Sequence, residues 1–457
     1  MRTNRIVGLS IMLIAWGYSH AISYSGKLPV LHIETDKKQE ITSKDYYLKG
    51  TYYLDPMGND VEAIGSKEVP DSLEIKGRGN YTWSAFDKKP YRLKLTEKAA
   101  LMGMNKSKHF ALLAHADDNK GFMRNTIGFY FSEQIRMAWT PKAKPVELVL
   151  NGDYKGLYFL TELIRVDKDR VNIVEQEDNE TDSDKITGGW LVEIDNYRED
   201  PQIRFMEGNT GEEMAITYKT PEELSSAQEK FLKEEMLRID SLVYGDKQSD
   251  ELWKYVDMDA LARFYIVQEI TDNYESFHGS CYLYRDMGEG QKWMFGPVWD
   301  FGSAFNYDKE QYLYKGREWH NHWIPEICKF PKFMDRVKEI WQWLHYYKYD
   351  SVYDYATEFA NHITEAAKND AERWNDKGYG NKDMAGRLRR IKERLTDTEK
   401  WLVKQWGEGK ATSVESVETG LSSEAVYYNL QGMRVEKPVK GQVYILVQGG
   451  KSKKVML

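Results

Sequence analysis

The sequence predicts an α+β protein with a β-rich N-terminal part, a core made of a mixed lobe and a helical lobe, and a small C-terminal β module. Short runs of alternating apolar and polar residues fill residues 28–100, whereas residues 330–406 have the apolar spacing of helices. After Trp406 the composition changes to Gly, Ser, Thr and Glu, which separates a last β-rich segment. At 457 residues the chain can bury a sizeable core.

The first 21 residues have the pattern of a secretory signal peptide. Arg2 and Arg5 precede an apolar run over residues 6–18, and a small-x-small cleavage site ends at Ala21. The run is too short to span a bilayer comfortably, which argues against a membrane anchor. We therefore expect a secreted, periplasmic or cell-surface protein with no transmembrane segment in the mature chain.

Charge, cysteine and histidine content narrow the function classes. The formal net charge of −8 offers no basic field, so no nucleic-acid partner is expected. Cys281 and Cys328 lack metal-ligand spacing, and we interpret them as two buried thiols. His320 and His322 stand in a Trp-rich loop without a paired carboxylate motif, so we interpret them as packing or surface residues.

The N-terminal half reads as strands joined by short turns. Apolar or aromatic runs predict strands at residues 28–33 and 46–53, and strict alternation predicts two more at residues 73–76 and 91–95. The dipeptide Asn151-Gly152 between residues 146–150 and 156–160 is a strong hairpin signal.

The middle of the chain mixes both element types. Residues 122–135 have helical character, and residues 188–195 read as a strand. Asp257 is a plausible N-cap for an apolar helix over residues 260–270. A hairpin over residues 281–295 follows and leads directly into Asp300-Phe-Gly302.

The C-terminal part contains one long amphipathic helix and then a separate segment. Met384, Leu388, Ile391, Leu395 and Leu402 share one helical face, which predicts packing against the core. Residues 407–420 suit a linker, and residues 421–457 read as a short β module. Its segment 428–435 (YNLQGMRV) resembles the small C-terminal modules of secreted Bacteroidetes proteins, which implies a role in export or attachment.

The stretch from Thr271 to Gly302 holds residues that suit phosphoryl transfer. This chemistry needs acidic residues for Mg²⁺, a cation on the nucleotide phosphates and a carboxylate that orients the attacking hydroxyl. A helix ends near Asp272, Glu275 precedes Ser280 by five positions, and a hairpin leads to Asp300-Phe-Gly302. Protein kinases have their catalytic loop, hairpin and Asp-Phe-Gly in the same order.

Several segments together resemble the CotH kinase family of atypical kinases, over about residues 28–401. They are residues 76–83 (KGRGNYTW), 88–95 (KKPYRLKL), 122–125 (FMRN), 151–158 (NGDYKGLY), Glu162, 193–195 (EID) and 296–301 (GPVWDF). The resemblance implies an atypical protein-kinase-like domain over residues 22–406, with residues 22–70 as a β-rich lead-in. It also implies ATP with Mg²⁺ or Mn²⁺ as cofactors, and a protein acceptor at the cell surface or in the periplasm.

The resemblance also implies site residues. Arg78, Gly79 and Asn80 would border the nucleotide phosphates. Lys94 would contact a phosphate, with Arg92 on the same strand face and Lys89 as a fallback, and Glu162 would hold that lysine. Asp300 would bind the metal ion, with Ser280 at the position of the second metal ligand. Glu275 would be the catalytic base, with Asp272 as its substitute.

Two positions depart from the family pattern and leave alternatives open. The family usually has Asp where this chain has Glu275 and Gly302, and a carboxylate displaced by about a bond length impairs a near-attack geometry. The leading prediction is an extracytoplasmic protein kinase that acts on Ser or Thr. The alternatives are a catalytically weak pseudokinase that serves as a surface binding module and, because of 14 Trp and 31 Tyr, a carbohydrate-binding or carbohydrate-acting protein.

Overall fold

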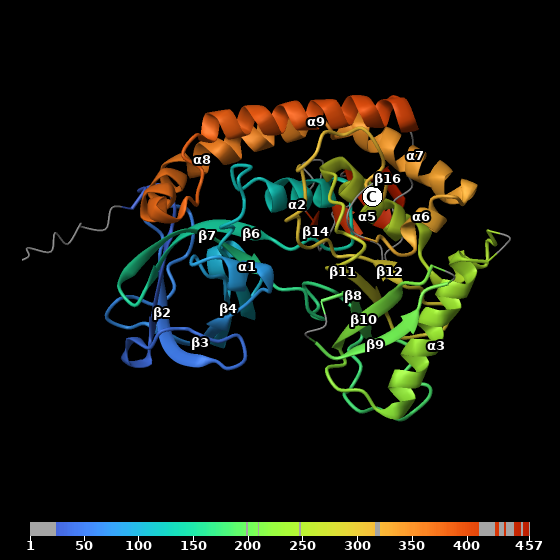
Figure 1. Ribbon diagram of the computed structural model, residues 1–457, viewed down its shortest axis with the longest axis horizontal. Helices are drawn as coiled ribbons and strands as arrows, with labels where there is room; N and C mark the ends of the chain where they lie inside the picture. The colour runs from blue at the N-terminus through green and yellow to red at the C-terminus, as the bar shows by residue number, and fades with distance from the viewer. Residues whose placement is uncertain are drawn as a thin grey trace, which may run out of the picture.

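Seven strands close into a barrel in the computed structural model (Figure 1). They are β1 (Val30–Thr35), β2 (Leu48–Asp55), β3 (Asp71–Gly77), β4 (Tyr91–Ala99), β5 (Ser107–Leu113), β6 (Ala143–Leu150) and β7 (Asp153–Glu162). Their order is β1-β2-β3-β4-β5-β7-β6, and a parallel pairing of β1 with β6 completes the ring. The structure describes residues 24–197, 200–208, 210–245, 248–315 and 320–410, and the strands of the tail.

Alternation along the strands separates the interior of the barrel from its outside. Leu73, Ile75, Leu93 and Leu95 are buried in one apolar cluster inside the barrel, while the residues between them face outward. The predicted lead-in over residues 22–70 supplies β1 and β2, so it is part of this barrel. A buried ion pair connects the barrel to α8 (Ser351–Arg373): Lys88 Nζ and Asp370 Oδ1 are 2.7 Å apart.

A second sheet lies beside the barrel and is antiparallel throughout (Figure 1). Its order is β12-β11-β8-β10-β9, with β8 (Trp190–Ile194), β9 (Gln202–Met206), β10 (Glu213–Thr220), β11 (Cys281–Arg285) and β12 (Met294–Phe295). β8 is buried along its whole length, including its charged residue Glu193. The long helix α3 (Ser226–Val243) packs against β9.

The remaining helices form the other half of the core around α5 (Met258–Thr271). Asp257 caps α5 by accepting a hydrogen bond from the Ala260 N–H at 2.8 Å, as predicted. α5 contacts α2 (Arg124–Gln134), α7 (Pro331–Tyr347) and α9 (Met384–Trp406). The helices α8 and α9 run side by side along one side of the molecule (Figure 1). The short helices α4 (Leu252–Tyr255) and α6 (Ile324–Ile327) complete this part, whereas the short α1 (Tyr81–Ala85) lies between β3 and β4 at the barrel (Figure 1).

The prediction of a mixed α+β protein with a β-rich N-terminal part is confirmed. The Asn151-Gly152 turn joins β6 to β7 with both residues at positive φ, as the hairpin signal predicts. The two cysteines are free thiols, Cys281 buried and Cys328 half-buried. Among the described residues, no helix is both long and apolar enough to cross a bilayer.

The tail has the β character that was expected of residues 421–457. Its described strands pair in the order β14-β13-β15-β16. They are β13 (Val426–Tyr428), β14 (Arg434–Val435), β15 (Val443–Gln448) and β16 (Lys451–Met456). The predicted signal peptide over residues 1–21 and residues 411–420 of the predicted linker lie outside the described residues.

Candidate active site

A cleft of about 1380 Å³ lies between the barrel and the second sheet. This volume exceeds that of an ordinary small-molecule pocket, so it can take a nucleotide together with part of a larger acceptor. The lining residues come from β3 and β4 on the barrel side and from β8, β10 and β11 on the other. The loops after α5 and after β12 complete the lining.

The barrel side of the cleft is cationic. Lys76 on β3 and Arg92 on β4 are register partners, as are Glu74 and Lys94, so their side chains project from the same outer face of the barrel. Arg78, just after β3, has its guanidinium 5.7 Å from the Trp299 ring centroid. This face forms one wall of the cleft. The cationic side chains of Lys76, Arg78, Arg92 and Lys94 therefore line the same cavity.

The opposite side of the cleft is acidic. Its carboxylates include Glu193 on β8, Asp195 directly after β8, and Glu275 and Asp300 in the loops that follow α5 and β12. Burial, reinforced by the nearby Asp195, raises the pKa of Glu193 to about 7, although the Lys219 ammonium 3.1 Å away lowers it. Lys219 occupies a register irregularity of β10, and such a bulge re-aims a side chain.

Asp300 is held in place through its backbone. It has a φ of +53°, which is unusual for a residue other than glycine, and its carbonyl accepts a hydrogen bond from Asn273 Nδ2 at 3.0 Å. Asn125 Oδ1 accepts from the next N–H, that of Phe301, at 2.8 Å. Arg124 donates to the Gly302 carbonyl. The FMRN segment of α2 therefore anchors the Asp-Phe-Gly loop.

The side chain of Asp300 opens into the cleft. Its Oδ1 accepts from the Gly302 N–H at 3.0 Å. Enclosure by surrounding protein raises the pKa of Asp300, and the Glu275 carboxylate raises it further, while Arg78 and Arg124 act in the opposite sense. A cation beside Asp300 would offset the effect of the Glu275 carboxylate on Asp300.

Glu275 is oriented by two hydroxyl groups. Tyr197 Oη donates to one of its oxygens, and Ser303 Oγ donates to the other at 2.7 Å. Ser280 lines the same cleft with a φ of +53°. The structure thus brings Arg78, Gly79, Asn80, Arg92, Lys94, Glu275, Ser280 and Asp300 to one cleft.

Glu162 does not pair with Lys94 as expected. Lys94 is opposite His109 on β5, while Glu162 is opposite Phe110, the next residue. Because consecutive strand residues face opposite sides, the two side chains point away from each other. Glu162 instead accepts a hydrogen bond from the Lys142 N–H at 3.1 Å, and Lys94 forms its ion pair with Glu74 at 3.2 Å.

Asp272 and Lys89 also lie outside the set of residues that line the cleft. Asp272 is the left-handed C-cap residue of α5, and its buried carboxylate accepts from Lys309 Nζ at 2.9 Å. Lys89 Nζ donates to the Trp83 carbonyl at 2.5 Å. Asp272 and Glu275 are close in sequence, but their side chains have different surroundings. Glu275 lines the cleft, whereas Asp272 is buried against Lys309.

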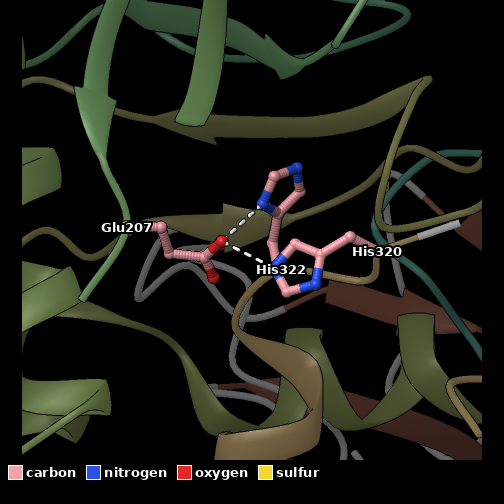
Figure 2. Close-up of side chains that lie close together, drawn as sticks. All are labelled: Glu207, His320 and His322. Atoms are coloured by element: carbon pink, nitrogen blue, oxygen red, sulfur yellow. Dashed lines mark hydrogen bonds and ion pairs between the residues drawn. The ribbon is translucent and has the colours of Figure 1, made fainter. Parts of the chain in front are cut away.

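Sequence reasoning missed two groups of residues. Lys219 and Tyr197 line the cleft, and the β10 alternation around Lys219 was the available signal. His320 and His322 are not simple packing residues, because both contact the Glu207 carboxylate at 2.8 Å (Figure 2). These three residues form a group that can hold a metal ion. Glu207 lies 113 positions before His320, so no local motif reveals it.

Comparison with known protein families identifies the family of the chain. A family model described as CotH kinase protein matches residues 75–402, most of the chain. The chain belongs to the CotH kinase family. The CotH match begins within β3 and ends in α9, so it contains both walls of the cleft. No curated protein matches the chain.

Membership of the CotH kinase family indicates a kinase-like phosphotransferase. In general terms it also implies ATP, a divalent metal ion and a protein substrate. The CotH segments quoted from the sequence have distinct places in the structure: residues 76–83 and 88–95 build the cationic wall and its support, and residues 296–301 carry Asp300.

Proposed function

We propose that this protein transfers the γ-phosphoryl group of ATP to a Ser or Thr hydroxyl of an extracytoplasmic protein. The observation that carries the proposal is the opposition of the two walls across one cleft. Lys76, Arg78, Arg92 and Lys94 suit a polyphosphate, and Glu275 and Asp300 face them. The residues 1–21, with their signal-peptide pattern, support an extracytoplasmic location.

The residues present fit a divalent cation at Asp300. The donor set consists of oxygen atoms, from the carboxylate of Asp300 and the hydroxyl of Ser280, which suits Mg²⁺ or Mn²⁺. Enclosure and the Glu275 carboxylate beside it raise the pKa of Asp300, and a bound cation would act against both. When bound, the cation neutralises charge on the phosphate oxygens.

The chain's own residues can position the phosphates of ATP and accept the proton of the acceptor hydroxyl. The basic wall binds and orients the phosphates, and Glu275 faces the acceptor hydroxyl. The hydroxyl oxygen forms a new bond to Pγ, the bond from Pγ to the bridging oxygen of ADP breaks, and ADP leaves with the electron pair. The hydroxyl proton passes to the Glu275 carboxylate. Ser303, which already donates to Glu275 at 2.7 Å, marks the direction from which a hydroxyl reaches it.

A second candidate, a catalytically weak pseudokinase that serves as a surface binding module, is favoured by the departures from the family pattern at Glu275 and Gly302. Glu275 is one methylene longer than Asp, and Gly302 supplies no second acid. A Cβ at Gly302 would lie 3.1 Å from Asp300 Oδ1, so a side chain at position 302 would lie directly beside the Asp300 carboxylate. The carbohydrate alternative loses part of its basis in composition, because nine of the 14 Trp are buried in the described core.

Thermal unfolding with ATP, with and without Mg²⁺ or Mn²⁺, tests the site. A ligand that binds only the folded protein at a hundredfold excess over Kd stabilises it by about 2.7 kcal/mol. We expect a metal-dependent rise in Tm that Asp300→Asn removes. Asp335→Asn on α7, an exposed carboxylate far from the cleft lining, is the matched control and keeps the rise. An equal rise in wild type and Asp300→Asn would refute the assignment of Asp300.

Phosphate transfer to a generic protein acceptor separates the enzyme from the pseudokinase. For an enzyme, we expect activity in wild type, more activity in Glu275→Asp, and none in Glu275→Ala. For a pseudokinase, only the double variant Glu275→Asp/Gly302→Asp gains activity, because it alone restores both acids. Wild-type activity that survives in Glu275→Ala would contradict the role given to Glu275.

A further inference from the structure

Glu207, His320 and His322 form a compact cluster outside the cleft lining (Figure 2). Glu207 directly follows β9, and the two histidines lie in the loop that leads to α6. The two imidazoles point at one carboxylate oxygen: His320 Nε2 and His322 Nδ1 are each 2.8 Å from Glu207 Oε2. Three potential ligand atoms from two distant parts of the chain therefore converge on one point.

The donor types select the class of ion. Two imidazole nitrogens and one carboxylate oxygen are the three-ligand set of many Zn²⁺ sites, whereas Mg²⁺ and Ca²⁺ prefer oxygen alone. Glu207 and His322 are almost completely buried, and the His320 side chain is 31% exposed, so the cluster opens to solvent on one side.

The geometry needs only a small adjustment to accept an ion. All three ligand atoms lie within 4.8 Å of one another. Zinc bonds of about 2.0–2.1 Å at tetrahedral angles place ligand atoms roughly 3.3 Å apart. Each 2.8 Å contact would have to lengthen by about half an ångström, through a movement of the partly exposed His320 on one side and a small shift between the buried Glu207 and His322 on the other.

Outer partners orient two of the three ligands. Tyr244 Oη donates to Glu207 Oε1 at 2.5 Å, which leaves Oε2 directed at the histidines. The Asn196 amide is 2.8 Å from His322 Nε2, the ring nitrogen that faces away from Glu207. A half-turn of this amide presents its oxygen to an Nε2–H, which is the tautomer that a ligating Nδ1 requires. Such supports are characteristic of metal-ligating histidines.

We propose that Glu207, His320 and His322 bind Zn²⁺ as a second divalent site, with water in the open fourth position. The ion would clamp the turn after β9 to the loop before α6. Asn196 also contacts His278 Nδ1 at 3.0 Å, and His278 follows the proposed base Glu275 by three residues. The site therefore supports the loop that carries Glu275, and it binds zinc whether or not the cleft catalyses transfer.

Zinc titration of the untagged, chelator-treated full chain tests the proposal without nucleotide or activity. Competition with a chromophoric chelator should show one tightly bound Zn²⁺ per chain. Co²⁺ in its place should give the visible spectrum of a four-coordinate site. His320→Ala, at the exposed edge of the cluster, should remove this binding while circular dichroism remains that of the folded chain. Asn196→Ala, which removes an outer partner, should weaken the affinity about 10- to 100-fold.

The matched control is His362→Ala, which removes an exposed histidine of α8 and should leave zinc affinity unchanged. Absence of stoichiometric zinc in wild type would overturn the proposal, and the cluster would then be a hydrogen-bonded contact. Zinc binding that persists unchanged in folded His320→Ala would equally overturn it. A chain that binds zinc but not ATP would disprove the proposed function alone.

Discussion

Glu193 couples the stability of the protein to pH. It is buried on β8, and burial is the main reason that its pKa rises from 4.5 to about 7, with Asp195 adding to the effect. Between pH 4.5 and 7 the folded chain holds a proton here that the unfolded chain has released. The contribution of Glu193 to stability is therefore complete below pH 4.5 and falls as pH rises through this window.

We predict that Glu193→Gln increases the free energy of unfolding, relative to wild type, by more at pH 8 than at pH 5. Glutamine is nearly isosteric and needs no proton, so the variant avoids a cost of up to about 3 kcal/mol, from 1.36 kcal/mol per pKa unit. Lys219 keeps its ion pair with Asp200 at 2.7 Å. Chemical unfolding at both pH values measures the difference, with Glu97→Gln on the exposed part of β4 as control. Parallel pH profiles for wild type and Glu193→Gln would contradict the prediction.

At the scale of elements, α2 and the Asp-Phe-Gly loop form one packing unit. Phe301 is buried against Gly128 of α2, where a Cβ atom would lie 2.3 Å from the ring. Glycine is normally a poor choice inside a helix, by roughly 0.5–1 kcal/mol relative to alanine. Its use here follows from the close approach of the ring, which sets the position of Asp300 next to it.

We predict that Gly128→Ala destabilises the protein by about 1–3 kcal/mol, as overpacking does, despite the better helix propensity of alanine. Because Phe301 must move, Asp300 moves with it, and metal-dependent ATP binding should weaken more than the loss of stability alone explains. Thermal unfolding and ATP titration measure the two effects. Glu133→Ala, on the exposed side of α2, should change neither. A stabilised Gly128→Ala with normal ATP binding would show that the ring adapts.

The elements that could be predicted are those with short-range signals. The Asn151-Gly152 hairpin, the Asp257 cap and the amphipathic face of α9 were all readable from neighbouring residues. β9 and β10 were not predicted, although β10 supplies Lys219 to the cleft. The Lys94–Glu162 pair was wrong because strand register decides which face each residue occupies, and register depends on partners distant in sequence.

At the scale of the whole molecule, the decisive contacts join segments more than a hundred residues apart. Closure of the barrel depends on β1 pairing with β6, for example Leu31 with Leu148, and no local pattern encodes that parallel match. The site shows the same division. The order of Glu275, Ser280 and Asp300 is local and was predicted, and the meeting of Lys94 and Asp300 in one cleft was expected only through the family resemblance. The approach of His320 to Glu207 is a product of the tertiary fold that the sequence did not predict.

Two truncated chains that both begin after residue 21 can locate the C-terminal end of the core. Beyond α9, the chain remains bonded to α7: Trp341 Nε1 donates to the Gly407 carbonyl at 2.9 Å, and the Gly409 N–H donates to His345 Nδ1 at 2.8 Å. Trp406 itself is 2% exposed and packs against Trp341 and Tyr265. In contrast, the described tail strands pair with one another in a sheet of their own.

We therefore predict that a chain ending at Lys410 folds and binds ATP like the longer protein, with a Tm change equivalent to less than about 1 kcal/mol, or about 2–4 °C. A chain ending at Gln405 loses Trp406 and the bonds beyond it, and should be destabilised by at least about 3–5 kcal/mol, as for removal of a buried Trp side chain. Thermal unfolding of the two truncated chains beside the full one measures both effects. If the chain ending at Lys410 also fails to fold, residues 406–410 are not enough to complete the core. The residues after Lys410 would then be part of the core, which would contradict the prediction.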